Sequence, residues 1–192
     1  MVPIGLVLAG GAGRRMGRAK GELRVAGRRT LALRAAEALA PVCRGVLISV
    51  RPGSDNPAPG YPAIEDRPPP GRGPLAGILA GFESTDGADL LVLACDYPHA
   101  ETDLLRRLSD RSGDRHDIVM LTCGDGRDHP LVAWWSGRTR GRVCQALEQG
   151  TFGVRKLIAT WKLLRLGPAE LPGVDLEASL VNVNTKEDLR RL

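Results

Sequence analysis

The sequence predicts one α/β domain, with a single doubly wound, mostly parallel sheet flanked by helices, over residues 1–192. Short runs rich in leucine and β-branched residues are typical of buried parallel strands. These runs alternate with segments of helical spacing, as in doubly wound folds. A glycine-rich loop follows the first run directly, and open α/β sheets bind ligands at the carboxyl ends of their strands. The length fits one domain, since domains commonly have on the order of 100–150 residues.

The first half of the chain predicts two strands and one helix before a long loop. Ile4–Leu8 is apolar and ends at a glycine pair, which indicates a buried strand that leads into a loop. Leu31–Leu39 has helical spacing and stops before a proline, and Val46–Val50 is a second apolar run. Residues 51–73 contain many prolines and glycines, and we expect a loop throughout.

The second half continues the alternation. Pro74 suits the first position of a helix that runs through Leu75–Glu83. The uniformly apolar Leu90–Ala94 predicts a central strand. Thr185 and Asp188 resemble a capping box at the start of a last helix. The remaining expected strands are Ile118–Thr122 and Pro130–Trp135, and the expected helices are Glu101–Leu108, Arg138–Glu148, Val154–Ala159 and Lys186–Leu192.

Composition excludes several classes of protein. With 43% hydrophobic and 26% charged residues, the chain is neither disordered nor collagen-like. Its apolar runs are far shorter than the ~20 residues that span a bilayer, so we expect no membrane span. No basic stretch precedes the first apolar run, so we expect no signal peptide and a cytoplasmic protein. The four cysteines form no C-x-x-C pair, which favours buried thiols over a zinc cluster.

Positive charge is concentrated near the glycine-rich loop. The net charge is +5, and residues 1–54 hold ten Arg/Lys against two Asp/Glu. Nucleic acid is a poor partner because only 4% of residues are aromatic and few rings can stack on bases. The distribution favours a local anion site.

The loop after the first strand has the chemistry of a phosphate site. Glycines allow backbone N–H groups to approach phosphate oxygens, and arginine and lysine add charged donors. Neither the Walker A motif nor the dinucleotide fingerprint fits, because no Gly-Lys pair occurs and Met16 stands where the third glycine belongs. The loop residues in question are Leu8, Ala9, Gly10, Gly11, Gly13, Arg14, Arg15, Arg18 and Lys20.

Asp96 follows the central strand at its carboxyl end, where a carboxylate reaches the same cleft as the loop. Magnesium commonly takes one or two carboxylates together with substrate phosphates, so Asp96 is the candidate metal ligand. The sequence around Asp66 is equally compatible with an aspartate in a surface turn that has no role in binding. His129 could equally be a structural histidine, and Asn182 could equally belong to a helix entry.

The chain resembles nucleotidyltransferases with a Rossmann-like fold, most closely the molybdenum cofactor guanylyltransferases. The resemblance is carried by L-A-G-G-x-G-x-R-M-G-x-x-K at residues 8–20 and by four later segments in family order. These are Glu65-Asp66 with Gly73-Pro74-Leu75-Ala76-Gly77, Leu93-Ala94-Cys95-Asp96-Tyr97-Pro98, Asp128-His129-Pro130 and Val181-Asn182-Val183-Asn184-Thr185. The chain departs from the family at Ala19, where an aspartate is usual, and at Ser49-Val50-Arg51, where an asparagine often contacts the nucleotide.

This resemblance implies transfer of GMP from GTP to the terminal phosphate of molybdopterin or its molybdenum-loaded form, with release of pyrophosphate. It implies Mg²⁺ at Asp96, and a triphosphate held by Arg15, Lys20 and the backbone of Gly10–Gly13. It further implies that Asp66 contacts the nucleotide and that Gly73 lies against the guanine. The residues implied on the acceptor side, in the C-terminal part, are His129, Arg155, Asn182 and Asn184.

Three alternatives remain open from the sequence. The chain could use CTP, although CTP-using relatives tend to carry A-A-G in place of the L-A-G-G found here. It could form a nucleotide-sugar. It could also be a non-catalytic GTP-binding accessory protein, which Ala19 would favour. The implied partners are GTP and molybdopterin, with transient contact to proteins of cofactor biosynthesis and molybdoenzyme maturation.

Overall fold

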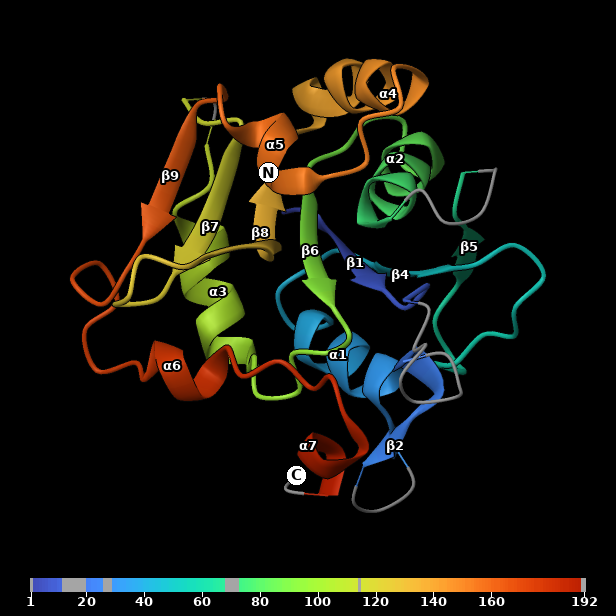
Figure 1. Ribbon diagram of the computed structural model, residues 1–192, viewed down its shortest axis with the longest axis horizontal. Coiled ribbons are helices and arrows are strands. Elements are labelled where there is room, and N and C mark those ends of the chain that lie inside the picture. The colour runs from blue at the N-terminus through green and yellow to red at the C-terminus, as the bar shows by residue number, and fades with distance from the viewer. Residues whose placement is uncertain (1, 12–19, 26–28, 68–72, 114, 191–192) are drawn as a thin grey trace.

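The computed structural model describes residues 2–11, 20–25, 29–67, 73–113 and 115–190 (Figure 1). Its main feature is one seven-stranded sheet in the order β5-β4-β1-β6-β8-β7-β9. Only β8 runs antiparallel to its neighbours. The strands of this sheet are β1 (Ile4–Leu8), β4 (Val46–Val50), β5 (Ala63–Glu65), β6 (Leu90–Ala94), β7 (Ile118–Thr122), β8 (Asp128–Trp135) and β9 (Leu163–Leu166). The predicted single, mostly parallel sheet is confirmed.

Helices cover both faces of the sheet, as expected for a doubly wound fold (Figure 1). One apolar layer packs between the sheet and α1 (Leu31–Leu39), α3 (Thr102–Asp110) and α6 (Leu176–Ser179). The other packs between the sheet and α2 (Pro74–Ser84), α4 (Arg140–Glu148) and α5 (Val154–Ile158). The side chains of β1 alternate between the two layers, because successive residues of a strand point to opposite faces.

The remaining elements are short. The hairpin strands β2 (Arg24–Val25) and β3 (Arg29–Thr30) pair outside the main sheet. Two 3₁₀ turns, η1 (Lys20–Glu22) and η2 (Gly137–Thr139), precede β2 and α4, and α7 (Lys186–Arg190) follows near the C-terminus. The predicted capping box of α7 is confirmed: Thr185 Oγ1 accepts from Asp188 N at 3.1 Å, and Asp188 Oδ2 accepts from Thr185 N at 2.8 Å.

Four of the predicted strands have the predicted bounds, and the fifth begins two residues earlier, at Asp128. The expectation of loop throughout residues 51–73 is wrong at Ala63–Glu65, which pairs in parallel with β4 as the edge strand β5. Pro62 stands directly before this strand, a position that an edge strand tolerates, because one side of that strand needs no ladder hydrogen bonds. All four cysteines are free; Cys95 and Cys123 are buried as expected, but the expectation of burial is wrong for Cys43 and Cys144, which are only partly buried. Within the described ranges, no helix combines the length and apolar character needed to cross a bilayer.

Asp117 connects α4 and the start of β9 to the sheet. It is 5% exposed and accepts from Arg138 Nε at 3.0 Å, Arg142 Nη2 at 2.7 Å and Lys162 N at 2.9 Å. Burial alone would raise the pKa of Asp117, but the hydrogen bonds from Arg142, Lys162 and Arg138 outweigh it and lower the pKa to about 2. A carboxyl group whose pKa is lower in the folded chain stabilises the fold above its unfolded pKa.

We therefore expect Asp117→Asn to lower the free energy of unfolding by about 2 kcal/mol at pH 7, since each pKa unit corresponds to about 1.4 kcal/mol. The difference between wild type and variant should shrink as the pH falls from about 5 towards 2, where the carboxyl takes up its proton in both states. Urea denaturation at a series of pH values measures this. A difference that stays constant over that range would contradict the proposed role of the Asp117 charge.

Candidate functional site

The strand register brings the glycine-rich loop and Asp96 to the same edge of the sheet. Leu8, the last residue of β1, pairs with Ser49 on one side and with Ala94 on the other. The pairing continues one residue further, because Ala9 N donates to Ser49 O at 2.9 Å and Cys95 N donates to Leu8 O at 3.2 Å. The chain therefore leaves β1 and β6 at equivalent positions, and adjacent strands are about 4.8 Å apart. The shared edge expected from the sequence is present.

Asp66 packs directly against the backbone of this loop. Its N–H donates to Val50 O at 2.8 Å, which places it at the carboxyl end of β4 and β5. One carboxylate oxygen accepts a hydrogen bond from the buried Ser49 hydroxyl. The other, Oδ2, lies 2.5 Å from the point where a Cβ on Gly10 would stand. Burial raises the pKa of Asp66, and the Ser49 hydrogen bond and the Arg51 charge offset part of the rise.

Arg51 also holds the first glycine of the loop. Its Nε donates to Gly10 O at 2.6 Å. Sequence reasoning left this position unassigned, because the resemblance leads one to expect an asparagine near it. The structure shows that Ser49, near the end of β4, holds Asp66, and that Arg51, directly after β4, holds Gly10.

Gly73 precedes α2 as its N-cap residue, with φ of +70°. A side chain there would be strained, because L residues rarely adopt this region. Of the other predicted nucleotide-site residues, Leu8 and Ala9 are buried and Gly11 is exposed. Lys20 is the first residue of η1, and its side chain is outside the described part of the chain. Gly13 and Arg15 also lie outside the described residues.

The segment that carries the two asparagines returns to the end of β6. Val183 is buried, and its N–H donates to Asp96 O at 2.9 Å. Asn182 is half-buried, and its side chain hydrogen-bonds to Tyr97. Asn184 is exposed, and its N–H donates to Asp188 Oδ2 at 2.9 Å in the capping box. Of the two asparagines, Asn182 is thus the one whose side chain lies beside the residue that follows Asp96.

His129 lies at the same edge, at the start of β8. It is 5% exposed, with Nδ1 3.2 Å from the Tyr97 hydroxyl and Nε2 3.4 Å from Cys123 Sγ. Burial lowers the pKa of His129, and the charges of Arg127 and Arg155 lower it further. The neutral imidazole is therefore favoured.

Three cationic side chains flank this region, from the turn before β8, from α5 and from β9. Arg155 Nη2 donates to Asp128 O at 3.3 Å, and Arg165 Nε lies 3.1 Å from both carboxylate oxygens of Asp128. Arg127 hydrogen-bonds to Cys123 and is exposed. Sequence reasoning proposed Arg155 but missed Arg127, although Arg127 immediately precedes the Asp128-His129-Pro130 segment that it used.

The carboxylates at this edge suit a magnesium ion that is completed by phosphates. Among the described residues, no group of three or more His, Cys, Asp or Glu side chains could hold a metal by itself. Mg²⁺ usually keeps waters and takes one or two carboxylates with substrate phosphates. Asp96, half-buried at the end of β6, supplies such a hard oxygen donor.

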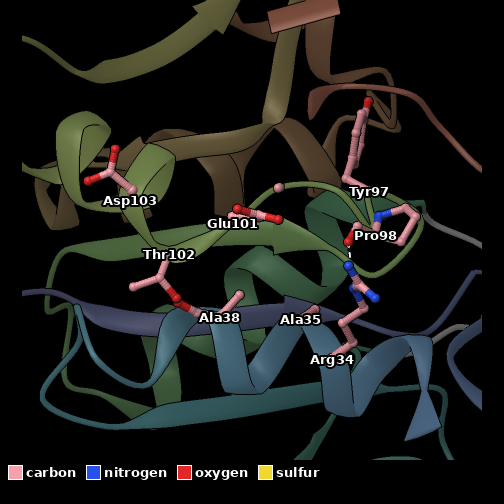
Figure 2. Close-up of a pocket in the computed structure, with 9 residues that line it drawn as sticks. Arg34, Ala35, Ala38, Tyr97, Pro98, Glu101, Thr102 and Asp103 are labelled. Carbon is pink, nitrogen blue, oxygen red and sulfur yellow. Dashed lines mark hydrogen bonds between the residues drawn. The ribbon is translucent and has the colours of Figure 1, made fainter. Parts of the chain in front are cut away.

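A cavity of about 320 Å³ lies beneath the loop that follows Asp96, between that loop and α1 (Figure 2). Arg34 Nε reaches from α1 to Pro98 O at 2.6 Å. Thr102 Oγ1, at the start of α3, donates to Ala38 O at 3.0 Å. These bonds fix the loop to α1, on the side away from His129.

Comparison with known proteins identifies the family of this chain. The family model of the MobA-like NTP transferase domain matches residues 5–166. The molybdenum cofactor guanylyltransferase of Rhodobacter capsulatus is 33% identical over 191 residues, covering 97% of this chain and 93% of the relative. The enzyme of the same name from Haemophilus influenzae (strain 86-028NP) is 27% identical over 187 residues, covering 97% and 95%.

Solved structures show the same fold. The molybdopterin-guanine dinucleotide biosynthesis protein A of Archaeoglobus fulgidus superposes with a TM-score of 0.79 at 25% identity, covering 98% of this chain and 95% of that one. The 2-C-methyl-D-erythritol 4-phosphate cytidylyltransferase of Thermus thermophilus has a TM-score of 0.68 at 18% identity, covering 100% and 97%, and shares the fold alone. With the family model matching most of the chain, and with relatives similar along nearly all of it, the chain belongs to the family of MobA-like NTP transferase domains.

Proposed function

We propose that this protein, a nucleotidyltransferase, transfers GMP from GTP to the terminal phosphate of molybdopterin or its molybdenum-loaded form, with release of pyrophosphate. The relatives that match nearly its whole length are named molybdenum cofactor guanylyltransferases. The observation that carries the proposal is the position of Asp96. Its strand lies beside the strand that leads into the glycine-rich loop, and its carbonyl holds the asparagine segment through Val183.

The division of the site follows from this position. The loop from Gly10, together with Arg15 and Lys20, would hold the triphosphate, Asp66 would contact the nucleotide, and Gly73 would lie against the guanine. On the other side of Asp96, the acceptor would be held by the residues at the ends of β7 and β8, by α5 and by the asparagine segment: His129, Arg155, Asn182 and Asn184.

The proposed reaction requires alignment of the reacting groups and neutralisation of charge, and it requires no proton transfer to activate the nucleophile. A phosphate acceptor is ionised near neutral pH, so its oxygen is already nucleophilic and needs no general base. Fixed backbone amides and cationic side chains then place the acceptor oxygen opposite the leaving pyrophosphate and stabilise the charge that develops there. Mg²⁺ held by Asp96, when bound, would supply further neutralisation at the α-phosphate. The proposal includes a cytoplasmic location and transient contacts with proteins of cofactor biosynthesis and molybdoenzyme maturation.

We expect GTP with Mg²⁺ to raise the melting temperature more than CTP, UTP or ATP does. A ligand at 100 times its dissociation constant adds about 2.7 kcal/mol of stability, and each kcal/mol shifts the melting temperature of a domain of this size by about 2–4 °C. The expected rise with GTP is therefore about 5–10 °C, and a thermal-shift assay with each nucleotide measures it. A larger rise with CTP would contradict the choice of GTP.

The same protein should release pyrophosphate from GTP only when molybdopterin is supplied. Pyrophosphate is measured with an enzyme-coupled assay, and the dinucleotide product is identified by mass spectrometry. A GTP-dependent thermal shift without molybdopterin-dependent release would indicate a non-catalytic GTP-binding protein. Release of pyrophosphate from GTP when a sugar 1-phosphate replaces molybdopterin would indicate nucleotide-sugar synthesis.

A further inference from the structure

The Tyr97 side chain connects three segments of the proposed acceptor half-site, and none of the roles above includes it. Its hydroxyl lies 3.2 Å from Nδ1 of His129, and the side chain of Asn182 hydrogen-bonds to the same tyrosine. The rings of Tyr97 and His129 meet edge to face, with centroids 5.6 Å apart and an interplanar angle of 78°. One phenol thus joins the end of β6, the start of β8 and the asparagine segment.

The backbone that carries Tyr97 is held in place. Tyr97 N donates to Ala94 O and Tyr97 O accepts from Ala100 N, both at 3.2 Å. Arg34 anchors the next residue, Pro98, to α1. Figure 2 shows the Tyr97 ring extending away from α1, while Arg34 reaches the loop from below. The ring is half-buried and packs against the apolar layers on both faces of the sheet.

The hydrogen bonds around the hydroxyl have one consistent order. Asn182 Oδ1 is buried and accepts no hydrogen bond from the described residues. The NH₂ end of the amide is therefore the end that donates to the Tyr97 oxygen. The Tyr97 O–H can then donate to His129 Nδ1, which requires the imidazole proton on Nε2. That proton faces Cys123 Sγ, 3.4 Å away.

The surroundings of His129 fit this order. The hydroxyl of Tyr97 can donate to Nδ1 only if the imidazole is neutral. Burial and the nearby charges of Arg127 and Arg155 lower the pKa of His129 and so favour the neutral form. Each donor in the hydrogen-bond chain from Asn182 through Tyr97 and His129 to Cys123 then has an acceptor. Among the described residues, only Asn182 Oδ1 in this chain has no donor.

We propose that Tyr97 is a positioning residue of the acceptor half-site: its hydroxyl holds the Asn182 side chain in place and keeps His129 protonated on Nε2. The inference rests on the proposed function, because Asn182 and His129 are among the residues proposed to hold the acceptor.

Tyr97→Phe removes the hydroxyl and keeps the ring. We expect the KM for molybdopterin to rise about tenfold, which corresponds to the loss of roughly one hydrogen bond's net contribution. The KM for GTP should stay within twofold of wild type. Tyr61→Phe is the matched control, because Tyr61 lies beside Ile4 and Val46 at the opposite edge of the sheet. The effect of the double variant Tyr97→Phe/Asn182→Ala should be smaller than the product of the two single effects, since both changes disrupt one hydrogen-bonded unit.

A second readout needs no substrate. Nitrogen-15 NMR of the imidazoles, with His129 assigned from the spectrum of His129→Gln, should show His129 protonated on Nε2 in the wild type and in Tyr61→Phe. Tyr97→Phe should shift the Nδ1 resonance because that nitrogen loses its donor. Protonation on Nδ1 in the wild type would overturn the proposed order of hydrogen bonds.

The two proposals fail in different ways. A wild-type protein that does not transfer GMP would overturn the proposed function. An active wild type whose KM for molybdopterin is unchanged by Tyr97→Phe would overturn the role of Tyr97 alone.

Discussion

Asp96→Asn should lower kcat for GMP transfer by about 10³-fold and change the dissociation constant for GTP by less than tenfold. Losing one electrostatic contact to charge that develops in the transition state costs on the order of 10²–10³ in rate, and a lost metal ligand removes several kcal/mol of charge stabilisation. GTP binding should survive because most of the predicted nucleotide contacts come from the glycine-rich loop, Asp66 and Gly73. The amide keeps the size of the carboxylate and removes its charge.

The variant should still fold. The structural contact that Asp96 makes with the asparagine segment uses its main-chain carbonyl, which accepts from Val183 N, and the substitution leaves that contact intact. Asp96→Ala should behave like Asp96→Asn, because the charge carries the effect.

The matched control is Asp103→Asn. Asp103 stands in the first turn of α3, is exposed, and pairs with Arg107 on its own helix. We expect its kcat to stay within twofold of wild type. Rates come from product formation at saturating GTP over a series of Mg²⁺ concentrations, and dissociation constants from calorimetry. GMP transfer at the wild-type rate by Asp96→Asn would remove the metal-holding role from this residue.

The strands were predictable where burial is complete. Leu90–Ala94 is apolar at every position and lies at the centre of the sheet, so one local run specifies both the element and its bounds. The placement of Asp96 follows from the same run, because the residue after a central parallel strand must emerge at the carboxyl edge of the sheet. This part of the site needed no knowledge of distant contacts.

The edge strands, and the contacts between side chains that are distant in the sequence, were not predictable in this way. Ala63–Glu65 is only three residues long and only half-buried at its centre, so its pattern gives no strand signal against the surrounding prolines. Leu163–Leu166 lies at the other edge and contains an exposed arginine. Tyr97 contacts His129 across 32 positions of sequence, and nothing in the local pattern pairs them. The sequence did point to the position of Arg51, because the related enzymes often have a nucleotide-contacting asparagine close to it.

Gly10→Ala should weaken GTP binding by about 100-fold and lower the free energy of unfolding by roughly 1–3 kcal/mol, the usual cost of an overpacked site. The new Cβ would stand 2.5 Å from Asp66 Oδ2. Asp66 has little room to retreat, because its other oxygen is hydrogen-bonded to Ser49 and lies 3.0 Å from the Cβ position of Gly77. Gly10 is restrained as well, since its carbonyl accepts from Arg51. Either the loop or the carboxylate must shift, and both are proposed to face the nucleotide.

Two comparisons separate the steric effect from the functional one. Gly45→Ala is the matched control, because its Cβ would have its nearest contact at 3.8 Å, with Ile4 Cδ1, at the opposite edge of the sheet. We expect it to leave GTP affinity unchanged. Adding Asp66→Ala to Gly10→Ala removes the overlapping oxygen and should raise the melting temperature part of the way back, since the buried Ser49 hydroxyl loses its acceptor. It should not restore GTP affinity, because the nucleotide then loses its Asp66 contact. Thermal melts and calorimetric titration with GTP measure both effects. If the double variant recovered GTP affinity together with its melting temperature, Asp66 would be a packing partner of the loop and would have no part in binding the nucleotide.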